Sequence, residues 1–364
     1  MLERNIDMTK IDIISGFLGA GKTTLIKKLI QEKAFENEKL MIIENEFGEI
    51  GIDGGFLNNS GIEITEMNSG CICCSLVGDF GVALKEALAK YSPDRIIIEP
   101  SGVGKLSDVI KAVEGIKDEV NIRLNSFAAV VDAVKCKMYM SNFGEFFNNQ
   151  IENANTIVLS RTQKLNEEKL ELCVSLIREH NSKAAVITTN WEEISAKQIL
   201  LAMEQDNSLE KELLNEIKEH RDCKHHHHHN ENCECNHKHE HNKEECSCSN
   251  EEHNHVHECS CGHDHSSDEH HHADEVFTSW GVETPKKYSK EEINNILKNL
   301  AELDEYGIIL RAKGIIPCSE GGWINFDLVP GEYEVREGLP DYTGRLCVIG
   351  TNLVKSKIEK LFHI

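Results

Sequence analysis

The chain has 364 residues, of which 40% are hydrophobic, enough for one large or two ordinary domains. It carries 62 Asp and Glu against 39 Lys and Arg, a formal net charge of −23. This acidity argues against binding to nucleic acid or to an anionic membrane, because both require basic surface. No apolar run is long enough to span a bilayer, and the first ten residues lack the apolar core of a signal peptide. We therefore expect a cytoplasmic protein whose 14 cysteines are reduced.

Residues 10–205 alternate short apolar runs with amphipathic stretches, an order that is typical of α/β domains. The apolar runs predict strands at residues 11–15, 40–43, 95–99, 126–131, 156–159 and 184–188. The amphipathic stretches predict helices at residues 25–33, 80–91 and 166–180. Because most of the runs are continuously apolar, the strands should be buried on both faces, as in a mostly parallel sheet. We predict a three-layer α/β domain.

Residues 206–275 differ in composition from the segments on either side. Residues 206–220 predict a linker helix of mixed charge, whereas residues 222–275 hold 16 of the 19 His and 7 of the 14 Cys. The latter segment carries 14 acidic and 3 basic side chains, a net charge of −11, and no aromatic residue. It cannot bury enough apolar surface to offset its chain entropy, so we expect it to be disordered without metal.

Apolar residues return over residues 276–364. The pattern predicts strands at residues 277–281, 307–315, 322–328, 333–336 and 345–350, and helices at residues 289–303 and 353–362. Because most of these strands follow one another after a single helix, we predict a small α+β domain with an antiparallel sheet. The chain thus divides into a first domain (10–205), a linker and metal-rich segment (206–275) and a second domain (276–364).

Residues 16–23, GFLGAGKT, match the phosphate-binding pattern G-x-x-x-x-G-K-[ST] in full. A predicted strand precedes the match and a predicted helix follows it, which is the context that the motif requires. In such a loop, backbone N–H groups surround a phosphate, the lysine bridges the β- and γ-phosphates, and the hydroxyl binds Mg²⁺. We assign Lys22 to catalysis and Thr23 to Mg²⁺. The nucleotide-binding residues predicted in this segment are Gly16, Gly19, Ala20, Gly21, Lys22, Thr23 and Thr24.

Glu99 ends the buried run 95–99 and is followed by PSGVG. This order is typical of a Walker B strand, whose acid reaches the Mg²⁺ shell or the attacking water, with a mobile γ-phosphate sensor after it. We assign Glu99 as the second catalytic residue. Asp132, which follows the predicted strand 126–131, competes for the Mg²⁺ role, although an acid at a strand end more often caps a turn.

Cys71, Cys73 and Cys74 stand within four positions, in the sequence GCICC. Thiolates bind soft or borderline cations, and three of them can supply three ligands of a tetrahedral zinc site. The alternative is that they are inert core residues, but three cysteines beside a glycine favour a metal site. Upstream, the sequence ENEFGEIGID places three carboxylates within six residues, where a P-loop GTPase has its first switch.

The combination of GFLGAGKTT, ENEFGEIGID, GCICC and a strand-end glutamate resembles the CobW family of P-loop GTPase metallochaperones. The segments LRAKG, NFD and RLCVIG, between residues 310 and 350, resemble the CobW C-terminal domain. The resemblance implies GTP and Mg²⁺ as cofactors and delivery of Zn²⁺, Co²⁺ or Ni²⁺ to a client metalloprotein, and a homodimer is compatible with it. By motif, Cys71, Cys73 and Cys74 carry over as metal ligands, with Glu44 and Glu49 as supporting ligands.

The guanine-reading motif of the family resembles N-K-x-D after a buried strand. Here the predicted strand 156–159 is followed by Ser160-Arg161-Thr162-Gln163. The carbonyl of Gln163 can accept a hydrogen bond from the base, but without the charge of an aspartate. We predict that Ser160, Arg161 and Gln163 bind the base, while the preference for GTP over ATP rests on the resemblance alone.

A repeat runs through the metal-rich segment. Pairs of the form C-x-C begin at Cys233, Cys246 and Cys259, an interval of 13 residues, and alternating histidines follow each pair. Compositional drift does not produce such a period, so we predict that the segment collects metal for the GCICC site and that nucleotide state controls its release. The alternatives are nickel or cobalt insertion into a metalloenzyme or cobalamin pathway, and metal storage by a protein with a vestigial GTPase.

Overall fold

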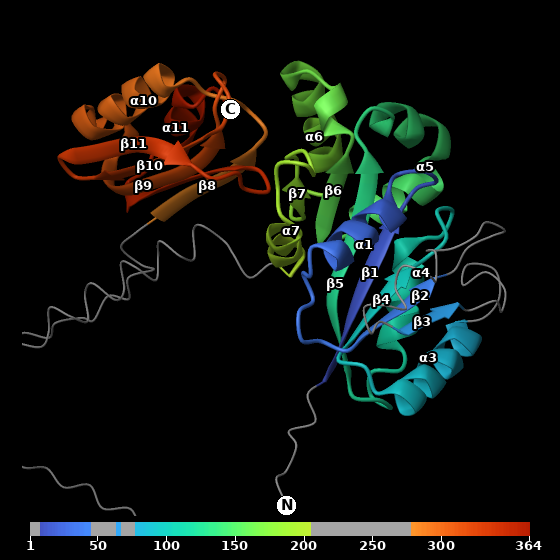
Figure 1. Cartoon of the computed structure of the whole chain (residues 1–364). Helices are drawn as coiled ribbons and strands as arrows, with labels where there is room; N and C mark the ends of the chain where they lie inside the picture. The colour runs from blue at the N-terminus through green and yellow to red at the C-terminus, as the bar shows by residue number, and fades with distance from the viewer. Residues whose placement is uncertain (1–7, 45–62, 67–76, 205–277) are drawn as a thin grey trace, which may run out of the picture.

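Two β-sheets organise the residues that the structure describes (Figure 1). The computed structural model describes residues 8–44, 63–66, 77–204 and 278–364. The helix predicted at 206–220 and the metal-rich segment 222–275 lie outside the described residues. Within the described ranges, no helix is both long and apolar enough to cross a bilayer.

The first sheet has the strand order β3-β2-β4-β1-β5-β6-β7. Its strands are β1 Thr9–Gly16, β2 Leu40–Glu44, β3 Glu63–Glu66, β4 Arg95–Glu99, β5 Ile122–Asp132, β6 Thr156–Ser160 and β7 Ala185–Ile187. Each pairing between these strands is parallel, which confirms the predicted mostly parallel sheet. The apolar runs predict all of these strands except β3, whose sequence EITE has a single aliphatic residue.

Helices cover both faces of this sheet. They are α1 Lys22–Gln31, α3 Val77–Tyr91, α4 Leu106–Glu114, α5 Cys136–Glu152, α6 Glu167–His180 and α7 Ala196–Met203. One core forms between the sheet and α1 with α7, and includes Ile14, Leu25 and Ile199. The other forms between the sheet and α3 to α6, and includes Ile13 and Phe147. The predicted three-layer domain is therefore confirmed, although the sequence patterns did not predict α4, α5 or α7.

The second sheet is antiparallel, with the strand order β11-β10-β9-β12-β8. Its strands are β8 Thr278–Thr284, β9 Ile308–Pro317, β10 Trp323–Val329, β11 Glu332–Gly338 and β12 Gly344–Thr351. Its helices are α10 Lys290–Glu302 and α11 Lys355–Leu361. Phe362 stacks against Trp280 and Phe326 in the shared core. Each of these strands and helices overlaps an element that the sequence predicts.

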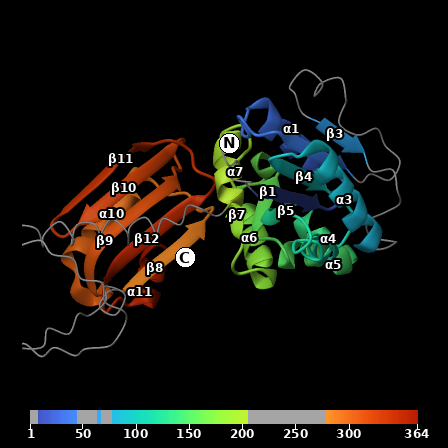
Figure 2. The same cartoon turned by 90° about the horizontal axis from the view of Figure 1, so that it is seen from below.

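The two sheets meet where β7 ends (Figures 1 and 2). The backbone N–H groups of Thr188 and Thr189 donate to Tyr342 O over 3.0 and 3.2 Å, and the hydroxyls of Thr188 and Thr343 lie 2.8 Å apart. The Tyr342 side chain is buried in the core formed by α1 and α7. The C-terminal sheet therefore contacts the same end of the parallel sheet that carries the phosphate loop.

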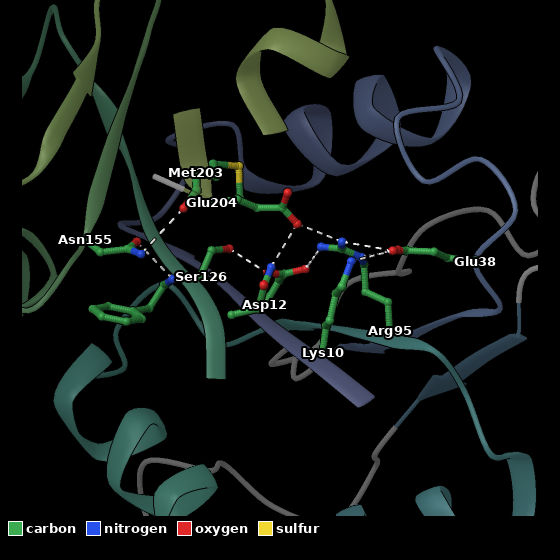
Figure 3. Close-up of polar contacts among 10 residues, drawn as sticks. Lys10, Asp12, Glu38, Arg95, Ser126, Asn155, Met203 and Glu204 are labelled. Atoms are coloured by element: carbon green, nitrogen blue, oxygen red, sulfur yellow. Dashed lines mark hydrogen bonds and ion pairs between the residues drawn. The ribbon is translucent and has the colours of Figure 1, made fainter. Parts of the chain in front are cut away.

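Arg95, the first residue of β4, is fully buried in a network of carboxylates (Figure 3). Its guanidinium pairs with Asp12 of β1 and with Glu38, and lies 2.8 Å from Glu204, which directly follows α7. Asp12 also accepts hydrogen bonds from Ser126 and Asn125 of β5. A buried charge is costly unless it is paired, so these contacts hold the sheet together at the end away from the phosphate loop.

Candidate nucleotide and metal site

The phosphate loop connects β1 to α1 at the carboxyl edge of the parallel sheet. β1 ends at Gly16 and α1 begins at Lys22. Gly19 and Gly21 have φ angles of 67° and 109°, conformations that L side chains rarely adopt. Gly21 is the N-cap of α1, so the N–H groups of the first helical turn lie beside the loop. The loop therefore offers backbone donors to an anion such as a phosphate.

Thr23 and Glu99 meet at this edge of the sheet. Thr23 belongs to the first turn of α1, and its Oγ1 donates to Glu99 Oε1 over 2.9 Å. Glu99 is the last residue of β4 and is 3% exposed. A hydroxyl and a carboxylate are the oxygen ligands that Mg²⁺ prefers, so the pair fits a magnesium site between loop and strand.

The end of β6 is bonded to the phosphate loop. Ser160 Oγ donates to Ala20 O over 2.6 Å. Arg161 has a positive φ of 61°, and its guanidinium donates to Gly19 O over 2.9 Å and to Asp132 Oδ2 over 2.5 Å. Ser160 and Arg161, which the sequence predicts to bind the nucleotide base, thus contact the loop that would surround the phosphates.

Gln163 and Asp132 have different surroundings. Gln163 lies in the short 3-10 helix Thr162–Lys164, with its side chain exposed. Asp132 Oδ1 accepts the N–H of Val134 over 3.1 Å, and Oδ2 accepts from Arg161. Asp132 therefore caps the turn after β5 and pairs with Arg161. This geometry favours Glu99 over Asp132 as the magnesium ligand.

Trp191 is a site residue that the sequence patterns did not identify. Its Nε1 donates to Leu159 O at the end of β6 over 2.9 Å. A Cβ atom built on Gly21 would lie 3.4 Å from Trp191 Cη2, so the indole ring packs against the end of the phosphate loop. The position of Trp191 in the sequence, four residues after β7, could have identified it. Residues that directly follow parallel strands lie at the same edge of the sheet, where the phosphate loop also lies.

Glu44 is the predicted transition-metal ligand that lies in a described element. It is the last residue of β2, in register with Glu99 of β4 on one side and with Glu66 of β3 on the other. Three strands thus end in glutamate at the edge that carries Thr23. The other predicted ligands, Cys71, Cys73, Cys74 and Glu49, lie outside the described residues.

The four cysteines in the described part of the chain are buried core residues. They are Cys136, Cys173, Cys318 and Cys347. Contact with the thiol of Cys136, together with burial, raises the pKa of Cys173 and disfavours the thiolate that a metal requires. Within the described ranges, no three His, Cys, Asp or Glu side chains form a cluster suited to a metal ion.

Two family models match this chain on either side of the metal-rich segment. The nucleotide-binding domain of the CobW/HypB/UreG family matches residues 10–188. The C-terminal domain of the cobalamin synthesis protein CobW matches residues 277–363. The chain belongs to the CobW family. The phosphate loop and the Thr23–Glu99 contact both lie within the first matched domain.

Curated relatives of this CobW-family chain include proteins named as zinc chaperones. The zinc chaperone YeiR of Escherichia coli is 35% identical over 161 residues, covering 44% of this chain and 49% of the relative. The zinc chaperone YjiA of Escherichia coli is 32% identical over 193 residues, covering 50% and 58%. The zinc chaperone CobW of a Sinorhizobium species is 34% identical over 187 residues, covering 44% and 52%. The chain therefore spans about half the length of the curated relatives it matches.

The solved structures that align with this chain have lower sequence identity to it than these curated relatives. The zinc-bound YjiA GTPase of Escherichia coli aligns over 98% of both chains, with 19% identity and a TM-score of 0.40. The hydrogenase maturation factor HypB of Archaeoglobus fulgidus aligns over 59% of this chain and 92% of its own, with 16% identity and a TM-score of 0.39. Similarity at this level supports no inference about function.

Proposed function

We propose that this chain is a GTP-hydrolysing metallochaperone that binds a transition metal, with zinc as the first candidate, and delivers it to a client metalloprotein. The observation that carries the proposal is the Thr23–Glu99 contact, which joins the phosphate loop to β4 at the edge where β2 and β3 also end. Membership of the CobW family supports it. So do the zinc-chaperone names of three relatives.

The roles in hydrolysis follow from the geometry of this edge. The backbone donors of the loop bind the phosphates, and Lys22, in the first turn of α1, stabilises the charge that develops on them. Thr23 and Glu99 would hold Mg²⁺, which would supply positive charge to the phosphates. Ser160 and Arg161 support the loop from β6, and the base extends from it toward Gln163 and Trp191.

In the sequence, the proposed transition-metal ligands follow strands that end at this edge. The GCICC segment directly connects Glu66, at the end of β3, to α3, and the segment with Glu49 follows Glu44, at the end of β2. Cys71, Cys73 and Cys74 bind the metal in this proposal, with Glu44 and Glu49 as supporting ligands. Because the proposed metal ligands directly follow strands that end at the nucleotide edge, we expect metal and nucleotide each to change the affinity for the other.

The coupling is tested by measuring GTP affinity with and without one equivalent of Zn²⁺, in the wild type and in Cys73→Ser. We expect zinc to shift the affinity of the wild type and not that of the variant. Equal affinities in all four measurements would contradict the coupling. Metal analysis of protein purified without an affinity column distinguishes zinc from cobalt and nickel.

Nucleotide preference requires its own measurement, because Gln163 stands where the family motif has aspartate. A competition titration of ATP against bound GTP gives the ratio of affinities. We expect GTP to bind more tightly. If ATP binds as tightly as GTP, the assignment of guanine is wrong.

Metal storage is a second candidate function, favoured by the 13-residue repeat of C-x-C pairs. Deletion of residues 222–275 separates the two functions. A chaperone should keep metal-stimulated GTPase activity at saturating metal, whereas a storage protein should lose most of its metal capacity and show no stimulation. The cytoplasmic location, the client and a homodimer belong to the same proposal.

A further inference from the structure

The loop after Glu99 is held by a buried glutamine. Gln150, in α5, is 1% exposed, and its Nε2 donates to Gly104 O over 2.9 Å and to Gly102 O over 3.2 Å. Ser101 O accepts the N–H of Gly104 over 2.9 Å, which closes a turn between the two held carbonyls. One amide group thus fixes two peptide groups of the segment that directly follows the magnesium-binding glutamate.

The same loop packs against the phosphate loop. A Cβ atom on Gly102 would lie 2.9 Å from both the backbone N and Cδ2 of Leu18, so a side chain at this position would collide with the phosphate loop. The close approach exists because residue 102 is glycine. Residues 100–104 therefore lie between the phosphate loop on one side and Gln150 on the other.

Helix α5 is itself fixed relative to the phosphate loop. Phe17, within the loop, contacts the rings of Tyr139, Phe143 and Phe147, with ring centroids 4.8, 5.2 and 5.9 Å away. Phe147 is buried and lies one turn before Gln150. The amide that holds residues 102 and 104 is therefore positioned by the loop that would bind the phosphates.

We propose that Gln150 is a positioning residue for nucleotide hydrolysis, and this inference rests on the proposed GTPase function. By holding the carbonyls of Gly102 and Gly104, it keeps residues 101–103 where their backbone N–H groups can meet the γ-phosphate, while the N–H of Gly104 closes the turn to Ser101. Because a peptide group is planar, fixing Gly102 O also directs the N–H of Val103 away from α5. Gln150 acts on the triphosphate through this loop and does not touch the nucleotide.

We expect a variant without the Gln150 amide to lose most of its GTP hydrolysis while it still binds GDP. Gln150→Leu has a similar volume and removes both donors. The freed loop should lower the rate of GTP hydrolysis at saturating GTP and Mg²⁺ by about tenfold or more, since small displacements at a reacting centre have effects of this size. GDP has no γ-phosphate for the loop to contact, so its affinity should change less than about twofold.

Asn149→Leu is the matched control on the same helix. Asn149 accepts the N–H of Ser107 over 3.2 Å and donates to its hydroxyl over 3.1 Å, so it holds the start of α4 instead of residues 102–104. Both variants lose buried or partly buried hydrogen bonds and should unfold at lower temperature than the wild type. The control should keep the hydrolysis rate of the wild type within about twofold.

The decisive quantity is the ratio of affinities for guanosine 5′-(β,γ-imido)triphosphate and GDP, which does not depend on turnover. We expect Gln150→Leu to reduce this ratio about tenfold and Asn149→Leu to leave it unchanged. A purely structural role of Gln150 would lower the unfolding temperature without moving the ratio, and that result would overturn the inference. If the wild type binds both nucleotides but does not hydrolyse GTP, the GTPase proposal fails and the role of Gln150 in hydrolysis fails with it; an unchanged ratio in an active wild type overturns the role of Gln150 alone. If it binds neither, both fail.

Discussion

Thr23 and Glu99 are 76 positions apart, yet their oxygens are within hydrogen-bond distance. Each is placed by its own element, Thr23 by the first turn of α1 and Glu99 by the end of β4. Arg95, at the other end of β4, is placed by carboxylates from three separate segments. At the scale of single residues, one short strand thus carries both the proposed magnesium-binding acid and the charge that anchors the sheet.

Replacing Thr23 with alanine removes one of the two proposed magnesium ligands. We expect the affinity for GTP in saturating Mg²⁺ to fall about tenfold, the effect of losing one favourable contact to a charged group. Isothermal titration with and without Mg²⁺ measures the change. Thr23→Ser keeps the hydroxyl and should restore the magnesium dependence. An alanine variant with the magnesium dependence of the wild type would contradict the assignment.

Glu38 gives a prediction that depends on pH. Burial raises the pKa of Glu38, but hydrogen bonds from Arg95 and Lys10 outweigh it and leave the pKa below its ordinary value of 4.5. A carboxylate with a lowered pKa in the folded state stabilises the fold above the pKa of the unfolded chain, and this contribution is lost as the pH falls below it. Glu38→Gln should therefore lower the free energy of unfolding at pH 7, by about 1 kcal/mol.

Urea denaturation at pH 7 and near pH 3.5 measures this difference. The gap between Glu38→Gln and the wild type should narrow as the pH falls from the pKa of the unfolded chain through the lowered pKa of the folded state, because the carboxyl then takes up a proton. Glu36→Gln is the control, because Glu36 is an exposed side chain two residues away. A gap that stays constant between the two pH values would show that the ion pair with Arg95 does not stabilise the fold.

Helix α5 connects the phosphate loop, the loop after Glu99 and the core. The helix is interrupted at Phe143, whose φ and ψ of −133° and 30° are not helical, and Phe143 is 46% exposed. Phe147, one turn later, is buried against Phe17. At the scale of elements, α5 is therefore the helix that packs in the core and also contacts the two loops at the nucleotide edge.

The two phenylalanines of α5 offer a matched pair of substitutions. Phe147→Ala leaves a cavity in the core and should lower the free energy of unfolding by about 3 to 5 kcal/mol. Phe143→Ala removes a half-exposed ring and should cost much less. Midpoints of urea denaturation measure both, provided that the slopes agree. Equal losses in the two variants would contradict the packing described for α5.

At the scale of the whole molecule, the C-terminal sheet is joined to the end of β7, four residues before Trp191. Thr189 Oγ1 donates to Asp341 O over 2.6 Å, and Arg178 of α6 lies 3.0 Å from Glu283 of β8. Tyr342, in the connection between β11 and β12, completes a core of the first domain. The contact between the two sheets thus lies close in sequence to Trp191, which packs against the phosphate loop.

Tyr342→Ala tests whether the two sheets unfold together. Tyr342 is 7% exposed, so its loss should weaken the joint and separate one calorimetric transition into two. Tyr333→Ala on β11 is the control, because Tyr333 is 40% exposed on the strand at the far edge of the second sheet. It should leave the transition unchanged. A single transition in Tyr342→Ala would mean that other contacts couple the sheets.

The sequence alone determined the parallel sheet, the phosphate loop and the antiparallel sheet, because each depends on local periodicity or on a contiguous motif. It did not predict α5, since SNFGEFFNN combines glycine and asparagine with an irregular apolar pattern. Nor could it show that Thr23 bonds to Glu99, that Gln150 holds residues 102 and 104, or that Tyr342 joins the two sheets. These contacts join residues between 46 and 154 positions apart, the latter from Thr188 to Tyr342. Only the tertiary structure decides them, because strand order and helix packing bring distant segments to one edge of the sheet.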